Sequence, residues 1–160
     1  MNIVEGIPGV PRFRREEYAE KSSAYCLLIP IINEGGRIHR ELGRAQAAGI
    51  DKLVDIVICD GGSTDGCTQE DTLRSLGVNT LLTKMDTGKQ GAQLRMGIHW
   101  ALERGYEGIL TIDGNDKDSI EDVPRFLEKL REGFDLIQGS RFIPGGKAVT
   151  RPKAVISPSG

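Results

Sequence analysis

The sequence predicts an α/β fold with a mostly parallel sheet flanked by helices. Short apolar runs alternate with longer segments whose apolar residues recur at helical spacing. The apolar runs are continuous rather than alternating, which is typical of strands that are buried on both faces. Strands of this kind separated by helices form parallel βαβ units. The expected strands are 24–29, 53–59, 78–83, 108–112 and 134–138.

The segment before the first strand lacks this regular pattern. Residues 1–23 are polar, contain Pro8 and Pro11, and show little periodicity. A short helix over 13–21 is compatible with the sequence. We expect the whole segment to be a loose N-terminal arm.

Helices are expected between the strands. In the first of them, Ile38, Leu42 and Ala45 share one face, and Gly49 follows as a stop signal. The last begins at Ser119 and has acidic residues in its first turn, where the helix dipole favours them. The expected helices are 34–48, 67–76, 88–104 and the segment that begins at 119.

The regular pattern stops after Phe142. We therefore expect one domain over 24–146, an irregular tail over 147–160, and a fold whose C-terminal part is truncated.

Composition excludes several classes of protein. The 160 residues are 38% hydrophobic and 28% charged, values typical of one globular domain. The net charge of −2 offers no basic excess for nucleic acid, so we expect no nucleic-acid partner. The longest apolar stretch, 24–32, is too short to cross a bilayer. Three cysteines without a CxxC spacing indicate buried thiols, as Cys26 and Cys59 would be, in a reducing cytoplasm.

Polar residues stand directly after the predicted strands. In a parallel α/β sheet, ligands bind at the carboxyl ends of the strands, so these residues are candidates for one site. They are Asn33, Glu34, Asp60, Asp113, Ser140 and Arg141.

The stretch from Asp113 to Asp118 is a candidate metal site. A carboxylate and an amide two residues apart, Asp113 and Asn115, can both reach one hard cation such as Mg²⁺ or Mn²⁺. A solvated acidic loop with Ser119 as helix N-cap explains the same pattern.

Two glycine-rich turns are also open to two interpretations. Asp60 could accept hydrogen bonds from a base or ribose, or it could form an Asx-type turn that caps the next helix. At 88–91, free N–H groups of a helix start and Lys89 could meet phosphate, or Lys89 could be solvated. The chain has no GxGxxG sequence and no P-loop.

Five segments, in this order, resemble motifs of the family 2 glycosyltransferases. They are LLIPIINEGGRI, VDIVICDGGSTDG, GKQGAQLRMGIHWA, ILTIDGNDKD and DLIQGSRF, and they cover about 25–146. The last is similar to the G-S-R-[YF] segment of the polyprenyl-phosphate (dolichol-phosphate) mannosyltransferase branch. The resemblance implies a Rossmann-like GT-A fold for nucleotide-diphospho-sugar transfer.

The resemblance also implies roles for individual residues. Asp113 and Asn115 would hold Mg²⁺ or Mn²⁺ and the diphosphate, Lys89 would lie near the nucleotide, and Arg141 would face phosphate. Asp113 and Arg141 would be the catalytic residues. The implied nucleotide-sugar-binding residues are Pro30, Ile32, Asn33, Glu34, Asp60, Lys89, Asp113, Gly114 and Asn115.

The implied reaction is inverting transfer of a sugar from a UDP- or GDP-sugar donor to a lipid phosphate or glycan acceptor, with polyprenyl phosphate the expected one. We expect the protein to be located in the cytoplasm or at the cytoplasmic face of a membrane, with peripheral membrane association of the full-length protein.

The sequence departs from the family pattern at four positions. Ile32 stands where a tyrosine is frequent, and Gly61 and Asn115 each replace an aspartate. Lys117 brings a cation beside the expected metal. Together with the missing C-terminal half, these departures predict weak nucleotide binding and poor turnover by this chain alone.

Three other functions remain open from the sequence. The chain could be a non-catalytic nucleotide-sugar-binding module or a half-enzyme, or a purely structural α/β domain. A sugar nucleotidyltransferase is disfavoured because its G-x-G-x-R loop is replaced by PIINEGGR.

Overall fold

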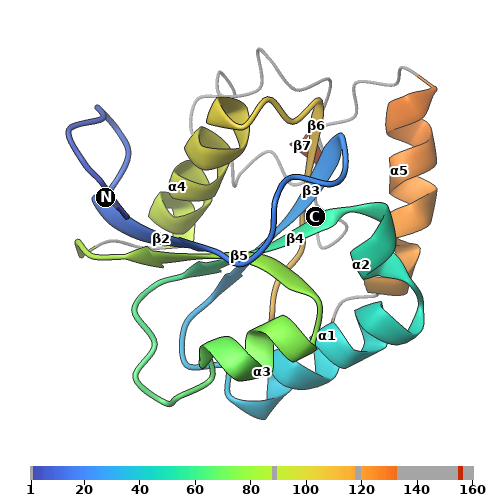
Figure 1. Ribbon diagram of the computed structural model, residues 1–160, viewed down its shortest axis with the longest axis horizontal. Coiled ribbons are helices and arrows are strands. Elements are labelled where there is room, and N and C mark those ends of the chain that lie inside the picture. The colour runs from blue at the N-terminus through green and yellow to red at the C-terminus, as the bar shows by residue number, and fades with distance from the viewer. Residues whose placement is uncertain (1, 88–89, 118–119, 133–154, 157–160) are drawn as a thin grey trace.

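In the part of the chain that the structure describes, seven strands form one sheet (Figure 1). The structure is a computed structural model that describes residues 2–87, 90–117, 120–132 and 155–156. The strand order is β1-β2-β5-β4-β3-β6-β7. The strands are β1 (Ile3–Val4), β2 (Phe13–Glu17), β3 (Tyr25–Ile31), β4 (Asp55–Asp60), β5 (Val78–Lys84), β6 (Gly108–Thr111) and β7 (Val155–Ile156).

The central strands are parallel, as the sequence predicts. β3 pairs with β4 and β6, and β4 pairs with β5, all in parallel. The connecting helices are α1 (Gly36–Ala47), α2 (Ile50–Leu53), α3 (Glu70–Ser75), α4 (Gln90–Glu103), the 3-10 turn η1 (Ile120–Asp122) and α5 (Val123–Arg131). The predicted α/β fold with a mostly parallel sheet is therefore confirmed.

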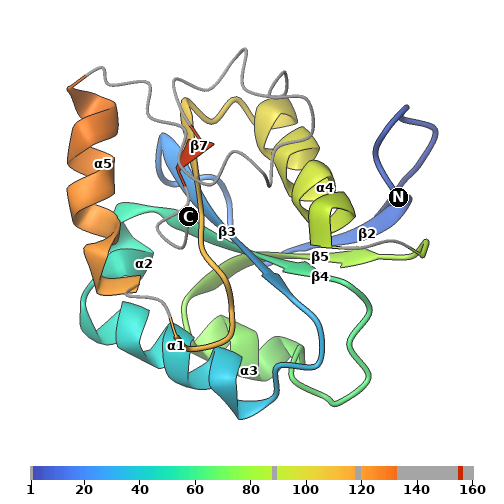
Figure 2. The same cartoon turned by 180° about the vertical axis from the view of Figure 1, so that it is seen from behind.

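Helices cover both faces of the sheet. α4 lies on one face, and α1, α2, α3 and α5 lie on the other (Figures 1 and 2). Successive residues of β3 supply the two cores: Leu27 and Ile29 pack toward α1, whereas Cys26 and Leu28 pack toward α4. This two-sided burial is why the strand is a continuous apolar run.

The N-terminal segment differs from the prediction. The short helix that the sequence allows over 13–21 does not form, and the expected loose arm is wrong for Phe13–Glu17, because β2 forms there and pairs antiparallel with β5, with Phe13 opposite Lys84. β1 in turn pairs with β2. These parts of the expected loose arm are therefore strands of the sheet. The charged sequence of β2 hides its strand character, since only Phe13 is fully buried. The domain boundary between 23 and 24 stays a prediction.

The C-terminal region is described only in part. The strand predicted over 134–138 lies outside the described residues. The tail expected to be irregular contains β7, which pairs in parallel with Ile109 and Leu110 of β6, so for these two residues the prediction is wrong.

All three cysteines are buried as free thiols, as predicted for Cys26 and Cys59. Within the described part of the chain, no helix has the length and apolarity needed to span a membrane.

Candidate functional site

The order of the strands creates a switch point between β3 and β6. From β3 the chain proceeds to β4 and then β5 on one side, and α4 then leads back to β6 on the other side of β3. Connections that leave two neighbouring strands in opposite directions open a crevice at the carboxyl ends of those strands. The loop after β3 begins with Ile32 and Asn33, and the loop after β6 includes Asp113 and Asn115, so these sequence candidates lie at the carboxyl ends of the two strands, where a crevice of this kind is expected.

Hydrogen bonds join the loop after β3 to the loop after β4. The N–H of Asn33 donates to Ser63 Oγ at 2.9 Å, and Asn33 Oδ1 accepts the N–H of Thr64 at 2.8 Å. Asn33 has φ 50°, a left-handed conformation that asparagine tolerates better than most residues. Asn33 therefore holds the two loops together.

Asp60 closes the turn that follows β4. It is only 1% exposed, and its carboxylate accepts the N–H of Ser63 at 3.0 and 3.1 Å and also the Ser63 hydroxyl. These bonds confirm that Asp60 forms a turn, but this turn does not cap the next helix, because α3 begins at Glu70 with Gln69 as its N-cap residue. Its contact with a base or ribose stays a prediction.

Gln93 is a site residue that sequence reasoning missed. It is buried on α4, and its Nε2 donates to the carbonyl oxygens of Ile31 and Cys59 at 2.8 and 2.9 Å. A side chain at Gly61 would meet Gln93, because an added Cβ would lie 2.9 Å from Gln93 Oε1. Gln93 thus joins the ends of β3 and β4, and the one signal for it was an amide in an apolar helix face.

Gly114 brings the loop after β6 against the end of β3. A Cβ on Gly114 would lie 2.4 Å from Ile31 Cγ2 and 3.1 Å from Ile29 Cγ2. Real Cβ atoms do not approach this closely, so the backbone passes here only because residue 114 is glycine. Three loops therefore meet at Ile31, whose carbonyl also accepts the N–H of Gly61 at 2.9 Å.

Two side chains of the acidic loop make different contacts, one within the loop and one to α1. Asn115 Oδ1 accepts the N–H of Lys117 at 3.0 Å within the loop. Asp116 instead forms ion pairs with α1: its carboxylate lies 3.2 Å from Arg40 Nε and 2.9 Å from an Arg44 terminal nitrogen. The sequence alone gives no sign of this pairing, since the partners are more than 70 positions apart.

The donor set is compatible with a divalent cation completed by substrate. Asp113 and Asn115 are oxygen ligands of the kind that Mg²⁺ and Mn²⁺ prefer. Among the residues that the structure describes, no group of three or more His, Cys, Asp or Glu could hold a metal. Such ions are commonly bound through one or two side chains together with substrate phosphates, and two protein ligands fit that arrangement.

The remaining predicted residues differ in accessibility. Pro30 is buried within β3, whereas Ile32 is 55% exposed beside it. Glu34 is half-buried and pairs with Arg37 at 3.1 Å. Lys89 and Arg141 lie outside the described residues.

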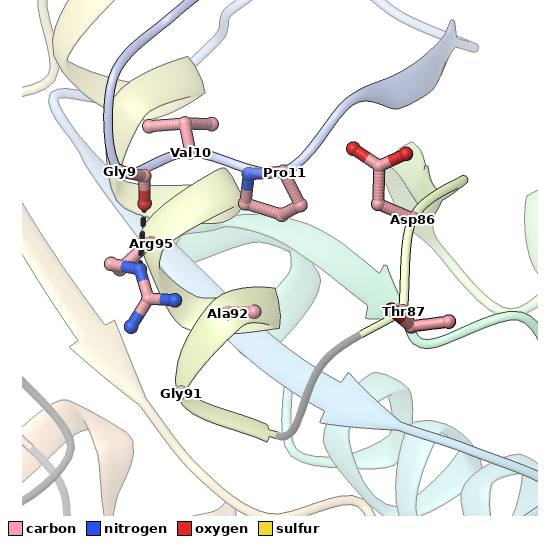
Figure 3. Close-up of a pocket in the computed structure, with 8 residues that line it drawn as sticks. All are labelled: Gly9, Val10, Pro11, Asp86, Thr87, Gly91, Ala92 and Arg95. Atoms are coloured by element: carbon pink, nitrogen blue, oxygen red, sulfur yellow. Dashed lines mark hydrogen bonds between the residues drawn. The ribbon is translucent and has the colours of Figure 1, made fainter.

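A pocket of about 540 Å³ lies between the N-terminal segment and the start of α4 (Figure 3). The backbone of Gly9 accepts a bond from Arg95 Nε at 2.7 Å, and Asp86 accepts the N–H of Arg12 at 2.7 Å. Both charged groups of the pocket are thus engaged by the protein. The pocket adjoins Gly91, where the predicted phosphate-binding helix start would be.

Sequence comparison finds relatives among sugar transferases, although no family model matches the chain. The chain is 34% identical over 128 residues to undecaprenyl-phosphate mannosyltransferase of Micrococcus luteus, covering 78% of this chain and 51% of that protein. It is 32% identical over 123 residues to polyprenol monophosphomannose synthase of Mycolicibacterium smegmatis, covering 75% and 46%. The chain spans about half the length of the curated relatives it matches.

Structure comparison supports the fold. Glucosyl-3-phosphoglycerate synthase of Mycobacterium tuberculosis, solved with Mn²⁺, UDP and glucosyl-3-phosphoglycerate, matches with a TM-score of 0.52 at 19% identity. The match covers 73% of this chain and 45% of that one. The sequence relatives and this likeness lead to one conclusion: the chain is a homologue of polyprenyl-phosphate mannosyltransferases and belongs with the family 2 glycosyltransferases of the GT-A fold.

Proposed function

We propose that the protein transfers a sugar from a UDP- or GDP-sugar to a polyprenyl phosphate, with Mg²⁺ or Mn²⁺ bound beside the donor diphosphate. The observation that carries this proposal is the loop of Asp113 and Asn115, held by Gly114 against the end of β3 at the switch point. The names of the sequence relatives support the class of acceptor, and the Mn²⁺ and UDP of the structural neighbour support the class of donor.

The loop after β3 is the proposed base site. Ile32 is exposed there, and the backbone of Asn33 is held by the turn that Asp60 forms through Ser63. Asp60 would therefore fix the backbone of the base site through Ser63, in addition to any hydrogen bond that it makes to the ribose. Pro30 and Glu34 would border the same site.

The proposed diphosphate site lies at the loop after β6. Asp113 and Asn115 would hold the metal, Gly114 would keep the loop close to the donor, and Lys89 and Arg141 would add positive charge for the phosphates. When bound, the metal supplies positive charge to the diphosphate as the sugar bond breaks. Peripheral association with the cytoplasmic face of a membrane would bring the lipid acceptor to this edge.

The chemistry requires little proton transfer. A lipid phosphate oxygen, already ionised, attacks the anomeric carbon, the bond from that carbon to the diphosphate breaks, and the nucleoside diphosphate leaves with the electron pair. The role of this chain is then to orient the donor and to stabilise the developing charge.

A non-catalytic nucleotide-sugar-binding module is the second candidate. One observation favours it: Asp116 is paired with Arg40 and Arg44, and Lys117 adds a further cation, so the loop is less acidic than its sequence suggests.

Thermal unfolding with nucleotides tests the proposal. UDP, GDP, UDP-glucose and GDP-mannose are each added with and without Mn²⁺, at about 100 times the dissociation constant, where binding adds roughly 2.7 kcal/mol of stability. We expect a Mn²⁺-dependent rise in Tm for one base. The rise should be lost in Asp113→Ala and kept in Asp71→Asn, which removes an exposed carboxylate on α3 that is not one of the proposed site residues.

Transfer of labelled sugar to polyprenyl phosphate then separates the two candidates. Binding with transfer supports the enzyme, and binding without transfer supports the module. No rise in Tm with any nucleotide, from a folded sample, would overturn both.

A further inference from the structure

The acidic loop is attached to the rest of the molecule on both sides of Asn115. On one side, Gly114 is pressed against Ile31 of β3. On the other side, Asp116 is bound to α1 through its backbone and its carboxylate. The position of Asn115 is therefore set by two contacts that belong to its neighbours in the chain.

The attachment at Asp116 is made by three residues of α1. The N–H of Asp116 donates to Oε1 of the buried Glu41 at 2.9 Å. Its carboxylate accepts Arg44 Nε at 3.1 Å and Arg40 Nε at 3.2 Å, and Arg44 also contacts Glu121 at 2.9 Å. Asp116 has φ 63°, a left-handed conformation that non-glycine residues adopt only when the surroundings stabilise it.

We infer that Asp116 is a positioning residue, through which Arg44 and Glu41 of α1 hold Asn115 in the conformation that binds the metal. This inference rests on the proposed metal and nucleotide site. It assigns Asp116 a role that differs from the obvious one for a carboxylate beside a metal loop, because its oxygens are directed to arginines.

The two possible roles of Asp116, metal ligand and positioning residue, predict opposite effects of removing Arg44 on metal affinity. Arg44 is a cation near a proposed cation site, so charge alone predicts that its removal strengthens metal binding. Removal would strengthen binding further if Asp116 were a ligand, since the carboxylate would be released. If Asp116 positions the loop, removing Arg44 weakens metal binding despite the lost positive charge.

The experiment compares Arg44→Met with Arg40→Met. The two arginines have the same charge and lie one turn apart on α1, but the side chain of Arg44 is 36% exposed and that of Arg40 is 65% exposed. Free Mn²⁺ is measured by electron paramagnetic resonance with UDP or GDP present, and nucleotide affinity is also measured without metal. Arg44→Met should weaken Mn²⁺ binding about tenfold. Arg40→Met should weaken it less, and metal-free nucleotide affinity should change by less than about twofold in both.

Three further variants keep the result interpretable. Arg44→Lys should restore part of the affinity, and Glu121→Gln should leave it unchanged, because the pairing of Arg44 with Asp116 remains. Asp116→Gly keeps the left-handed backbone accessible while removing the carboxylate, so it should fold and should weaken Mn²⁺ binding as Arg44→Met does. A double variant that combines Arg44→Met with Asp116→Gly should bind Mn²⁺ no more weakly than either single variant, since both substitutions remove the same contact.

Hydrogen exchange supplies a readout that needs no ligand. Exchange at the Asp116 N–H should be faster in Arg44→Met than in the wild type, with Tm confirming that the rest of the fold is intact. Unchanged or tighter Mn²⁺ binding by Arg44→Met would overturn the inference and leave the proposed function standing. Absence of Mn²⁺ and nucleotide binding in the wild type would overturn the proposed function and this inference with it.

Discussion

The two ends of strand β4 carry one aspartate each, and the protein uses them differently. Asp55 begins the strand and is 2% exposed. It accepts the Ser22 N–H at 2.9 Å, the Ser22 hydroxyl at 2.6 Å and the Tyr106 hydroxyl at 2.7 Å, with a longer bond from the Ser23 N–H. Asp55 therefore joins three separate segments at the amino edge of the sheet.

Asp60 ends the same strand and is bound almost entirely within its own turn. Its carboxylate accepts hydrogen bonds from the N–H and the hydroxyl of Ser63, three residues further along. Beyond this turn, Ile32 is exposed and Asn33 has a left-handed backbone. At the amino edge one buried carboxylate joins separate segments of the chain, whereas at the carboxyl edge Asp60 fixes the backbone of its own loop and the side chains of Ile32 and Asn33 remain exposed.

The largest effect should come from Asp55→Ala. Removing this carboxylate leaves the buried Tyr106 hydroxyl and the part-buried donors of Ser22 without their acceptor, and we expect a loss of about 3 kcal/mol in the free energy of unfolding. Urea unfolding followed by the fluorescence of Trp100, the single tryptophan, measures it. Asp55→Asn keeps one acceptor oxygen and should lose less. Nucleotide affinity of the folded protein should be unchanged; weaker binding would break the division between the two edges.

A smaller effect is expected from Gly114→Ala at the carboxyl edge. The new methyl group would overlap Ile31, and overpacking of this kind costs about 1–3 kcal/mol. Mn²⁺-dependent nucleotide binding should be lost along with part of the stability. The control is Gly43→Ala, where nothing lies within 4 Å of the added Cβ and α1 should gain about 0.5–1 kcal/mol. Intact nucleotide binding in Gly114→Ala would contradict the close approach of this loop to the site.

The smallest effect concerns alkaline pH at the amino edge. Burial, and then the hydrogen bond to Asp55, raises the pKa of Tyr106 above its ordinary value. The unfolded chain ionises its tyrosines near pH 10 while folded Tyr106 stays protonated, so its contribution to stability is complete below pH 10 and is lost as pH rises above it. Tyr106→Phe should reduce this loss and cost about 1 kcal/mol at pH 7.

Tyr18→Phe is the matched control for the alkaline experiment. Burial also raises the pKa of Tyr18, to about 12, but its hydroxyl has no hydrogen-bond partner in the described structure. Its removal should therefore cost little at pH 7 and should flatten the fall in stability between pH 10 and 12. Unfolding free energies measured across this range would contradict the assignment if neither variant changed the slope.

Much of the fold was predictable because burial on both faces leaves a clear pattern. The runs that form β3 to β6 are apolar and short. Gly49 follows α1 and Gly77 follows α3, and both have the positive φ typical of a residue at a helix end. β2 was not predictable in the same way. Its charged sequence has one buried apolar residue, and its strand state depends on pairing with β5, about 70 residues away.

The sequence indicated which loops form the candidate site, but it did not indicate which side chains bond to one another there. Strand-end positions indicated Asn33, Asp60, Asp113 and Asn115 because a parallel sheet brings its carboxyl ends together. The roles of Gln93 and Arg44 could not be read in this way, since each bonds to atoms more than 60 positions away.

The sequence by itself determined the parallel α/β architecture, the buried strands and the edge of the sheet where we propose the site, because these follow from local apolar periodicity and strand order. Only the tertiary structure decided that Asp60 closes a turn, that Gly114 presses on Ile31 and that Asp116 pairs with α1. These contacts depend on which side chain lies close to a given carboxylate or carbonyl in the folded chain, and the order of residues in the sequence does not give that distance.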